Sequence, residues 1–361
     1  MRRVILAGGG TAGHIEPALA VADAIKKIDR EIVCEFVGTE NGLEKALIPA
    51  RGYRLHFIPK ATLPRHLTLR SFAFPIQLIR TYLVARKIVK GSRLVIGFGG
   101  YVSAPIYLAA KRLQVPIVIH EANARPGFAN RLGRTFADVV AVNFETVRSR
   151  WPGAILTGMP IRESIASLAL KSKAERESFR EASAAKYELD PNRPIVAIFG
   201  GSQGSKKVNE VIVSAVSRLP SEIQVIHSVG RNNPLPPKSK NYLPLPYFED
   251  MASIYSCADL LVTRSGAVTC SELMTLSKFA ILVPLPHGNG EQSDNAADLV
   301  KAGLAISVPD SEFTDDWLIA QLPVALKKAQ GLSSLSHRDS ALMNCGAATR
   351  IAELALAEVA K

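Results

Sequence analysis

Two strand–glycine turn–helix openings constrain what this chain can fold into. The first is VILAGGGTAGHIEPALAV at residues 4–21, where Gly8, Gly10 and Gly13 fit the spacing G-x-G-x-x-G. The second is IVAIFGGSQGSKKVNEVI at residues 195–212. Each is typical of the start of a Rossmann-like domain, in which ligands bind at the carboxyl ends of the strands. The sequence therefore predicts two such domains facing each other across a cleft.

The remaining residues repeat the same alternation of strands and helices. Short β-branched runs, each followed by a helical stretch, lie at 32–37, 94–98, 116–120, 139–142 and 154–158, and then at 223–229, 260–263, 279–284 and 305–309. This order predicts an α/β protein with parallel sheets covered on both faces. A polar helical stretch at 163–194 separates the halves. We therefore expect domains at 1–162 and 163–339, followed by a helix at about 340–361 that packs on one of them.

Composition places the chain among globular proteins, with 47% hydrophobic and 21% charged residues. No apolar run approaches the roughly 18 residues that cross a bilayer, and the start MRRVILA is too short for a signal peptide, so a cytoplasmic protein is expected. Its four cysteines have no C-x-x-C pairing, which argues against a zinc site and favours reduced, mostly buried thiols.

Positive charge is concentrated in one segment. The net charge is +12, and residues 45–120 contain thirteen Lys or Arg and no Asp or Glu. Such a surface suits nucleic acid, anionic lipid or a phosphorylated substrate. A helical wheel begun at Pro75 places Leu78, Tyr82, Ala85 and Val89 toward the core. The other side combines apolar residues and cations, so with Arg70 we expect a patch that binds anionic lipid, formed by Arg70, Ile76, Ile79, Arg80, Leu83 and Lys87. A helix buried on both sides with snorkelling cations is the alternative.

The glycine turns are candidate seats for phosphate, because a helix start presents unpaired N–H groups and a positive dipole end. For a dinucleotide enzyme the acid expected about 20 residues on is Glu40, which comes late, and that interpretation leaves His14 unexplained. The second turn misses the Walker A spacing, yet Ser202 and nearby amides suit a diphosphate. A tight turn without a ligand explains the glycines equally.

Polar side chains follow several other predicted strands. In LLVTRSGAVTCSEL, Gly266 permits a turn, residues 267–269 supply helix-start amides, and Glu272 is placed to accept from vicinal hydroxyls such as a ribose. Gln292 and Asn295 suit sugar hydroxyls. In the first half, the small residues Gly99, Gly100, Ser103 and Ala104 precede a cluster of Glu121, Asn123 and Asn130. Ordinary caps, turns and solvated loop residues are the alternative for each.

Together these stretches resemble the MurG family of peripheral membrane glycosyltransferases, through GGGTAGH, GGYVSAP, HEANARPGFANR, GMPIR, GGSQG, FEDM and RSGAVTCSE. The resemblance implies a GT-B fold whose last helix packs back on the first domain. It implies transfer of N-acetylglucosamine from UDP-GlcNAc to the 4-hydroxyl of lipid I, with inversion, to give lipid II in peptidoglycan synthesis. It also implies donor contacts from Thr11, Ala12, Gly13, Asn123, Arg162, Ser202, Phe248, Ala267, Val268, Thr269, Cys270, Ser271, Glu272 and Gln292. The implied acceptor residues are Gly10, Gly100, Tyr101 and Asn130, with a diphosphate seated at the first turn.

The implied reaction gives His14 a role, because inversion needs a base that takes the proton of the acceptor hydroxyl. The dipole at a helix start favours the neutral imidazole. Hydrogen bonding to a phosphate is the alternative role for His14, and Glu121 is the reserve base. Without a D-x-D motif we expect no metal and no cofactor, with helix starts and Arg162 stabilising the leaving group. The enzyme would then lie on the cytoplasmic side of the cell membrane.

Three positions depart from the family pattern. Ala12 stands where a glycine is usual, Met159 stands where an asparagine is usual, and the family commonly has glutamine before Asn123.

A nicotinamide-dependent oxidoreductase would explain the first turn but not the loops of the second half. A basic lipid- or nucleic-acid-binding protein would explain the charge, but the chain has no aromatic-rich basic strand that stacks bases. We therefore expect no nucleic-acid partner.

Overall fold

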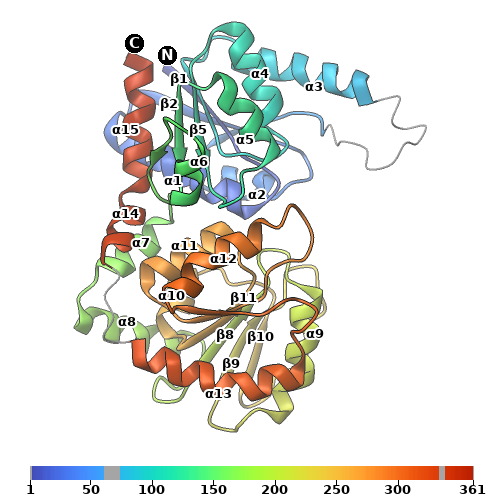
Figure 1. Ribbon diagram of the computed structural model, residues 1–361, viewed down its shortest axis with the longest axis vertical. Helices are drawn as coiled ribbons and strands as arrows, with labels where there is room; N and C mark the ends of the chain where they lie inside the picture. Colours follow the sequence, from blue (N-terminus) through green and yellow to red (C-terminus); the bar gives the residue numbers. More distant parts are fainter. Residues whose placement is uncertain (1, 61–73, 333–337, 361) are drawn as a thin grey trace. The chain divides into compact units, whose positions relative to one another are not determined.

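The computed structural model describes residues 2–60, 74–332 and 338–360, and the chain divides into two compact units. Unit 1 comprises Met1–Arg162 and Gly346–Lys361, and unit 2 comprises Glu163–Cys345. Each unit has its own parallel sheet with helices on both faces (Figure 1). The C-terminal segment joins unit 1 at residue 346 and not at 340, because α14 (Arg338–Cys345) packs on α11 of unit 2.

The sheet of unit 1 has seven parallel strands in the order β3-β2-β1-β4-β5-β6-β7. Their bounds are β1 (Arg2–Ala7), β2 (Ile32–Gly38), β3 (Arg54–Phe57), β4 (Leu94–Gly97), β5 (Ile117–Glu121), β6 (Val139–Val142) and β7 (Ile155–Leu156). The strand order reverses between β1 and β4, which pair in register from Val4 opposite Leu94. The carboxyl ends of these two strands are therefore the switch point at which such sheets bind ligands.

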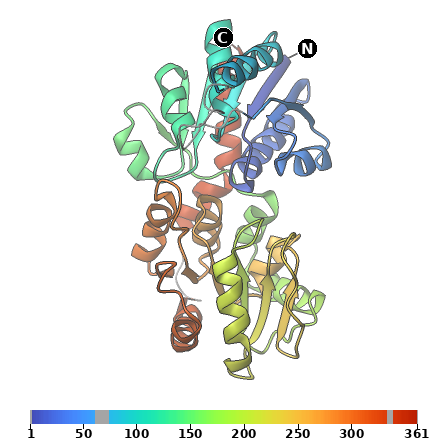
Figure 2. The same cartoon turned by 90° about the vertical axis from the view of Figure 1, so that its right-hand side faces the viewer.

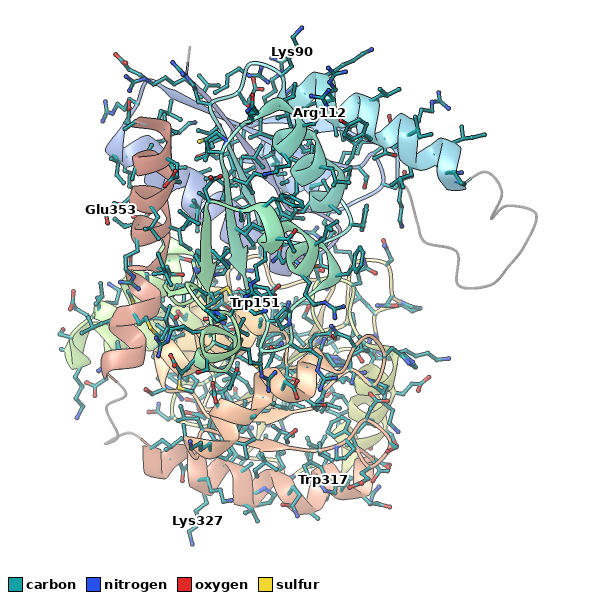
Figure 3. The ribbon with its side chains drawn as sticks, turned by 45° about the horizontal axis from the view of Figure 1, so that its top comes forward. Lys90, Arg112, Trp151, Trp317, Lys327 and Glu353 are labelled. Atoms are coloured by element: carbon teal, nitrogen blue, oxygen red, sulfur yellow. The ribbon has the colours of Figure 1, made fainter. Side chains whose placement is uncertain are left out.

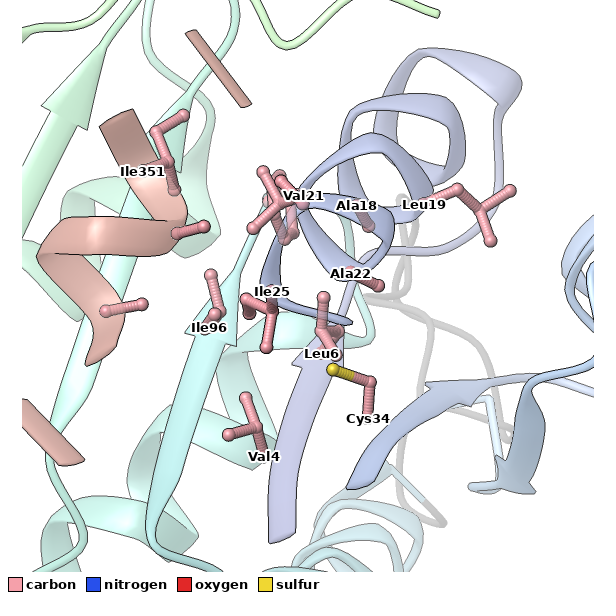
Figure 4. Packing of buried hydrophobic residues seen from close by; sticks show 14 of the residues in the cluster. Val4, Leu6, Ala18, Leu19, Val21, Ala22, Ile25, Cys34, Ile96 and Ile351 are labelled. Atoms are coloured by element: carbon pink, nitrogen blue, oxygen red, sulfur yellow. The ribbon is translucent and has the colours of Figure 1, made fainter. Parts of the chain in front are cut away.

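Helices cover both faces of this sheet. They are α1 (Ala12–Ile28), α2 (Glu44–Ala50), α3 (Phe74–Val89), α4 (Ser103–Leu113), α5 (Phe128–Gly133), α6 (Glu145–Arg150) and α15 (Ala347–Ala360). On one face α1 and α15 pack together over β1 and β4, where Leu6, Ile25 and Ile351 are buried (Figure 4). The turned view shows the same placement of α15 within unit 1 (Figure 2). On the other face, the second half of α3 packs on α4.

The sheet of unit 2 has six parallel strands in the order β10-β9-β8-β11-β12-β13. Their bounds are β8 (Ile195–Phe199), β9 (Gln224–Ser228), β10 (Tyr242–Leu245), β11 (Leu260–Thr263), β12 (Ala280–Leu282) and β13 (Ala305–Ser307). The helices besides α14 are α7 (Glu163–Leu170), α8 (Lys173–Lys186), α9 (Lys206–Ala215), α10 (Met251–Cys257), α11 (Ala267–Leu276), α12 (Glu291–Lys301) and α13 (Asp315–Gly331). Here the order reverses between β8 and β11, so the second glycine turn also lies at a switch point.

The predicted α/β class with two Rossmann-like sheets is confirmed, and the strands expected from apolar runs are present. The strands β3 and β10, each at one edge of its sheet, were not predicted from the sequence. β3 has the polar sequence RLHF, and β10 contains Pro244, which an edge strand tolerates because one side of its backbone is unpaired.

All four cysteines are free, and Cys34, Cys257 and Cys270 are buried, as predicted, while Cys345 is partly exposed. Among the described residues, none of the helices has the length and apolar character needed to span a membrane.

Candidate active site

The first glycine turn connects β1 to α1 at the switch point of unit 1. Gly10 has φ of +93°, a backbone conformation that favours glycine. At Gly8 a Cβ would lie 2.8 Å from the carbonyl oxygen of His14, so only glycine lets α1 start this close to the strand. Thr11 is the N-cap of α1 in extended conformation, and His14 follows in the first helical turn. The turn thus fixes His14 at the carboxyl end of β1.

The imidazole of His14 lies against the glycines that end β4. Ideal Cβ positions on Gly99 and Gly100 would be 3.5 and 3.4 Å from its ring, at Nε2 and Nδ1. Both glycines have positive φ, so the β4 turn makes room for the ring. Nδ1 of His14 lies 3.2 Å from the hydroxyl oxygen of Thr11, a distance that permits a hydrogen bond. The predicted base and the predicted acceptor residue Gly100 are therefore neighbours.

A buried carboxylate accepts a hydrogen bond from the backbone of the first glycine turn. Glu44, at the start of α2, is fully buried and its Oε2 accepts the N–H of Gly10 at 3.1 Å. Its Oε1 accepts the N–H of Thr39 at 2.8 Å and the hydroxyl of Thr39 at 3.1 Å. The hydroxyl of Tyr101 lies 3.0 Å from that of Thr39. Neither Glu44 nor Thr39 was predicted from the sequence as a site residue.

The loop after β5 is organised around Glu121, which is buried. Its carboxylate accepts from the N–H of Asn123 at 2.9 Å, the N–H of Gly127 at 3.2 Å and Nδ2 of Asn130 at 3.0 Å. Burial raises the pKa of Glu121, and these hydrogen bonds partly oppose the rise. Oδ1 of Asn130 accepts from the hydroxyl of Tyr107 at 2.8 Å. The predicted cluster of Glu121, Asn123 and Asn130 is therefore one hydrogen-bonded unit.

Arg162, the last residue of the first segment of unit 1, contacts α1. Its Nε lies 3.3 Å from Oε2 of Glu16, two residues after His14. Met159, one of the departures from the family pattern, is fully buried. Ala12, the other departure, is the first residue of α1 and is partly exposed.

The second glycine turn connects β8 to α9 and carries Ser202. Gly201 and Gly204 have positive φ, and a Cβ on Gly204 would collide with the carbonyl oxygen of Val229. Ser205 is the N-cap of α9, and its hydroxyl accepts the N–H of Val208. Ser202 itself is partly exposed within this turn.

Arg264, directly after β11, links four strand ends of unit 2. Its guanidinium donates to the hydroxyl of Ser205 at 2.8 Å and to the carbonyl oxygens of Val283 and Pro284. It also forms an ion pair with Asp310, at 2.5 Å. Only 8% of Arg264 is exposed, so it is a buried side chain that connects the second glycine turn to neighbouring loops. No role was predicted for Arg264 from the sequence.

The start of α11 presents the predicted amides and carboxylate. Gly266 is the N-cap, and the N–H of Cys270 is the first to bond back, to the Gly266 carbonyl oxygen at 2.9 Å. Glu272 is buried, and its Oε2 accepts the hydroxyl proton of Tyr255 at 2.9 Å. Phe199 packs edge-on against both Phe248 and Tyr255. Tyr255 was missed because no local spacing links it to a carboxylate on another helix.

Two amide side chains close the neighbouring loop. Oε1 of Gln292 accepts the N–H of Leu285 at 3.0 Å, across the loop that leads into α12. Nδ2 of Asn295, which is buried, donates to the carbonyl oxygen of Ser265 at 3.3 Å. Both residues thus shape the loops beside the start of α11.

The predicted lipid-binding patch lies mostly on α3. Ile76, Ile79 and Leu83 are exposed to 67%, 59% and 49%, and Arg80 and Lys87 are exposed as well. Arg70 lies outside the described residues. Ala85 and Val89 are buried as expected, but Leu78 is 42% exposed, so its expected core position was wrong. The first turns of α3 extend away from the sheet, and only its second half packs on α4 (Figure 1).

The predicted site residues divide between the two units. Unit 1 holds Gly10, Thr11, Ala12, Gly13, His14, Gly100, Tyr101, Glu121, Asn123, Asn130 and Arg162, and unit 2 holds Ser202, Phe248, Ala267, Val268, Thr269, Cys270, Ser271, Glu272 and Gln292. The side chains of Cys270 and Phe248 are buried. One signal could have found Arg264, since a charged residue directly after a switch-point strand is unusual in an apolar setting.

Comparison with known proteins supplies independent information. Residues 4–142 match the N-terminal domain of glycosyltransferase family 28, and residues 195–350 match its C-terminal domain. A curated UDP-N-acetylglucosamine–N-acetylmuramyl-(pentapeptide) pyrophosphoryl-undecaprenol N-acetylglucosamine transferase from Streptomyces avermitilis is 44% identical, with 93% of each chain covered. The protein of that name from Corynebacterium glutamicum is 41% identical over 99% of this chain and 98% of its own. The crystal structure of MurG from Acinetobacter baumannii matches with a TM-score of 0.70 and 28% identity, covering 99% and 100% of the two chains.

Proposed function

The chain belongs to the MurG family, within glycosyltransferase family 28, and on that basis we propose that it transfers N-acetylglucosamine from UDP-GlcNAc to lipid I. The product is lipid II, the disaccharide precursor of peptidoglycan. The protein is a GT-B glycosyltransferase built from two Rossmann-like domains. The observation that carries the proposal is that relatives of this function match nearly the whole chain at above 40% identity.

Unit 2 binds the donor in this proposal. The unpaired amides at the start of α11 and the turn with Ser202 suit the diphosphate of UDP-GlcNAc. The carboxylate of Glu272, oriented by the hydroxyl of Tyr255, accepts hydrogen bonds from the ribose hydroxyls. Since Oε1 of Gln292 is engaged by the N–H of Leu285, its amide nitrogen is the group that donates to the sugar.

His14 is the general base. If the Thr11 hydroxyl accepts from Nδ1–H, the lone pair of the neutral ring is on Nε2. Nε2 takes the proton of the acceptor 4-hydroxyl while that oxygen forms a bond to the anomeric carbon of the donor. The bond from that carbon to the UDP oxygen breaks, and the configuration inverts. UDP leaves with the electron pair, and helix-start amides together with Arg162 stabilise its charge without a metal ion.

Glu121 serves the same reaction indirectly. Donors from its own loop already occupy both of its carboxylate oxygens. A carboxylate in that state is better suited to holding Asn123 and Asn130 in place than to accepting a substrate proton. This favours His14 over Glu121 as the base.

The exposed face of α3 docks on the anionic surface of the membrane that carries the polyprenyl-linked acceptor. Ile76, Ile79 and Leu83 supply apolar area, and Arg80 and Lys87 supply positive charge. Lys90, directly after α3, extends its side chain outward from unit 1 (Figure 3). The enzyme is then a peripheral protein on the cytoplasmic side.

Transfer of radiolabelled N-acetylglucosamine to a lipid I analogue in EDTA tests this function. We expect wild-type activity without added metal, and a loss of about a hundredfold or more in kcat for His14→Ala with UDP-GlcNAc binding retained. His56→Ala, a histidine of β3 that contacts Glu35, is the matched control and should keep its kcat. Equal activity of His14→Ala and wild type would remove His14 as the base. If the wild-type protein neither transferred the sugar nor bound UDP-GlcNAc, the proposed function would be refuted.

A further inference from the structure

Glu44 is a buried carboxylate to which the proposed mechanism assigns no role. It rests in a space that three glycines leave open, since a Cβ on Gly38 or Gly42 would overlap its side chain and one on Gly9 would lie 3.0 Å from Oε1. Its partners include two backbone N–H groups, of Gly10 and Thr39, which can only donate. The local sequence is therefore shaped to hold an acceptor of hydrogen bonds at this point.

The position of Glu44 sets the direction of the hydrogen bonds around it. The hydroxyl of Thr39 has one proton and gives it to Oε1 of Glu44. In its contact with Tyr101, at 3.0 Å, the Thr39 oxygen must then accept, and the Tyr101 hydroxyl must donate. The proton of Tyr101 thus points toward Thr39, and only lone pairs of the phenolic oxygen remain for a ligand.

Tyr101 is also fixed beside the first glycine turn. Its ring edge lies 3.0 Å from the ideal Cβ position on Gly10, and the ammonium of Lys60 lies over the ring, 5.3 Å from its centroid. Tyr101 is partly exposed, whereas Thr39 and Glu44 are buried. Glu44, Thr39 and Tyr101 therefore form a chain of hydrogen bonds, called the relay below, that runs from a buried carboxylate to a hydroxyl beside the turn that contains His14.

Building on the proposed function, we propose that Glu44 and Thr39 are positioning residues that make Tyr101 a hydrogen-bond acceptor for the sugar or amide part of the acceptor substrate. A hydroxyl or amide N–H fits such a site. A phosphate does not, because phosphate oxygens require donors, and the N–H of Gly10 is already engaged by Glu44. This places the acceptor's diphosphate away from Gly10 and Tyr101.

Steady-state kinetics of a double-mutant cycle tests the relay. The variants are Tyr101→Phe, Thr39→Val, their combination, and Thr39→Ser, which keeps the hydroxyl. Since loss of one neutral hydrogen bond costs about three- to tenfold in affinity, we expect Tyr101→Phe to raise KM for a lipid I analogue by that factor. Thr39→Val should raise it in wild type but not in the Tyr101→Phe background, and Thr39→Ser should resemble wild type. The kcat and the KM for UDP-GlcNAc should stay within about twofold in all variants.

A phosphate-free glycoside of the acceptor sugar and peptide, used as a competitive inhibitor against the lipid I analogue, distinguishes sugar from phosphate. We expect Tyr101→Phe to weaken its inhibition by the same factor as it raises KM. Tyr53→Phe, which removes a hydroxyl bonded to Asp23, is the matched control and should change neither value.

Several results would overturn the relay. The first is that Thr39→Val and Tyr101→Phe raise the KM for the lipid I analogue independently, so that their effects multiply in the double variant. The second is that Thr39→Ser raises this KM as much as Thr39→Val does. The third is that Tyr101→Phe leaves this KM unchanged, or raises it without weakening inhibition by the phosphate-free glycoside. A glycoside that does not compete at all would place the acceptor's affinity in its phosphates and also overturn it. Each of these requires an active wild-type enzyme, so they differ from failure of the proposed function, in which wild type transfers nothing.

Discussion

Among the described residues, the sheet of each unit contains one fully buried histidine that takes no part in the proposed chemistry. Nε2 of His120 in β5 lies 3.1 Å from the carbonyl oxygen of Gly158, and His227 in β9 contacts Asn209 and Tyr242. Burial lowers the pKa of each to about 4. Both rings therefore stay neutral in the folded protein at pH values at which an unfolded chain would protonate them.

These two rings should make folding sensitive to acid. Well above pH 6.5 neither state binds the proton, so protonation of the rings does not change the free energy of unfolding. Between about pH 6.5 and 4 only the unfolded state binds it, so the free energy of unfolding falls as pH falls, by at most about 1.4 kcal/mol per pH unit for each histidine. Glu121, whose pKa burial raises, takes up its proton first in the folded state and partly offsets this loss.

Urea unfolding at several pH values, for wild type and His120→Gln, measures the effect. We expect the variant to lose less stability than wild type between pH 6.5 and 4.5, whatever its stability at pH 7. His287→Gln, at an exposed position, is the control and should keep the wild-type slope. A His120→Gln slope equal to that of wild type would show that His120 does not carry this pH dependence.

At the scale of single elements, the two glycine turns have the same strand–turn–helix form but differ in the charged side chain that hydrogen-bonds to them. The turn after β1 rests on the carboxylate of Glu44, whereas the N-cap serine of the turn after β8 is held by the guanidinium of Arg264. Because Asp310 pairs with Arg264, the second turn has no excess negative charge beneath it, whereas the carboxylate of Glu44 disfavours a diphosphate at the first turn. This difference agrees with donor binding in unit 2.

The same comparison shows what the sequence could and could not predict. The glycine turns and the apolar central strands are local patterns, and reading them located His14, Ser202 and Glu272 at switch points. Glu44 acts on Gly10 from 34 positions away, and Arg264 reaches Ser205 across 59 positions. Such partners depend on how distant strands pair, which no local spacing encodes. The edge strands β3 and β10 were missed because β3 is short and polar, and β10 contains Pro244, which favours a loop over a central strand.

The apolar side chains of α3 should determine membrane affinity. We expect Ile76→Ser with Ile79→Ser to weaken binding to vesicles with anionic lipid by at least tenfold, because each buried apolar side chain contributes about 1.5–3 kcal/mol. Leu170→Ser, at an exposed position of α7 in unit 2, is the control and should bind as wild type does. Added salt should weaken wild-type binding by screening Arg80 and Lys87. Unchanged vesicle binding of the double variant would exclude α3 as the docking element.

At the scale of the whole molecule, unit 1 is built from both ends of the chain. Ile351, Ala352 and Ala355 of α15 are fully buried in the same core as Ile25 of α1 and Leu6 of β1 (Figure 4). In the described part of the chain, α15 joins unit 1 only after the sheet and helices of unit 2. The core of unit 1 therefore closes only once residues about 350 positions apart have met.

This arrangement predicts that a change near the C-terminus destabilises the unit that holds His14. Ile351→Ala should lower the stability of unit 1 by about 2–5 kcal/mol, because it removes buried methyl groups and leaves a cavity. Leu342→Ala, at an exposed position of α14 only nine residues earlier, should change it by less than about 0.5 kcal/mol. Hydrogen exchange followed by mass spectrometry resolves the units, and we expect faster exchange in β1, α1 and β4 with β8, β9 and β11 unaffected. Equal acceleration in both sheets would mean that the two units unfold as one, and protection of β1 equal to that of wild type would mean that α15 does not complete the core.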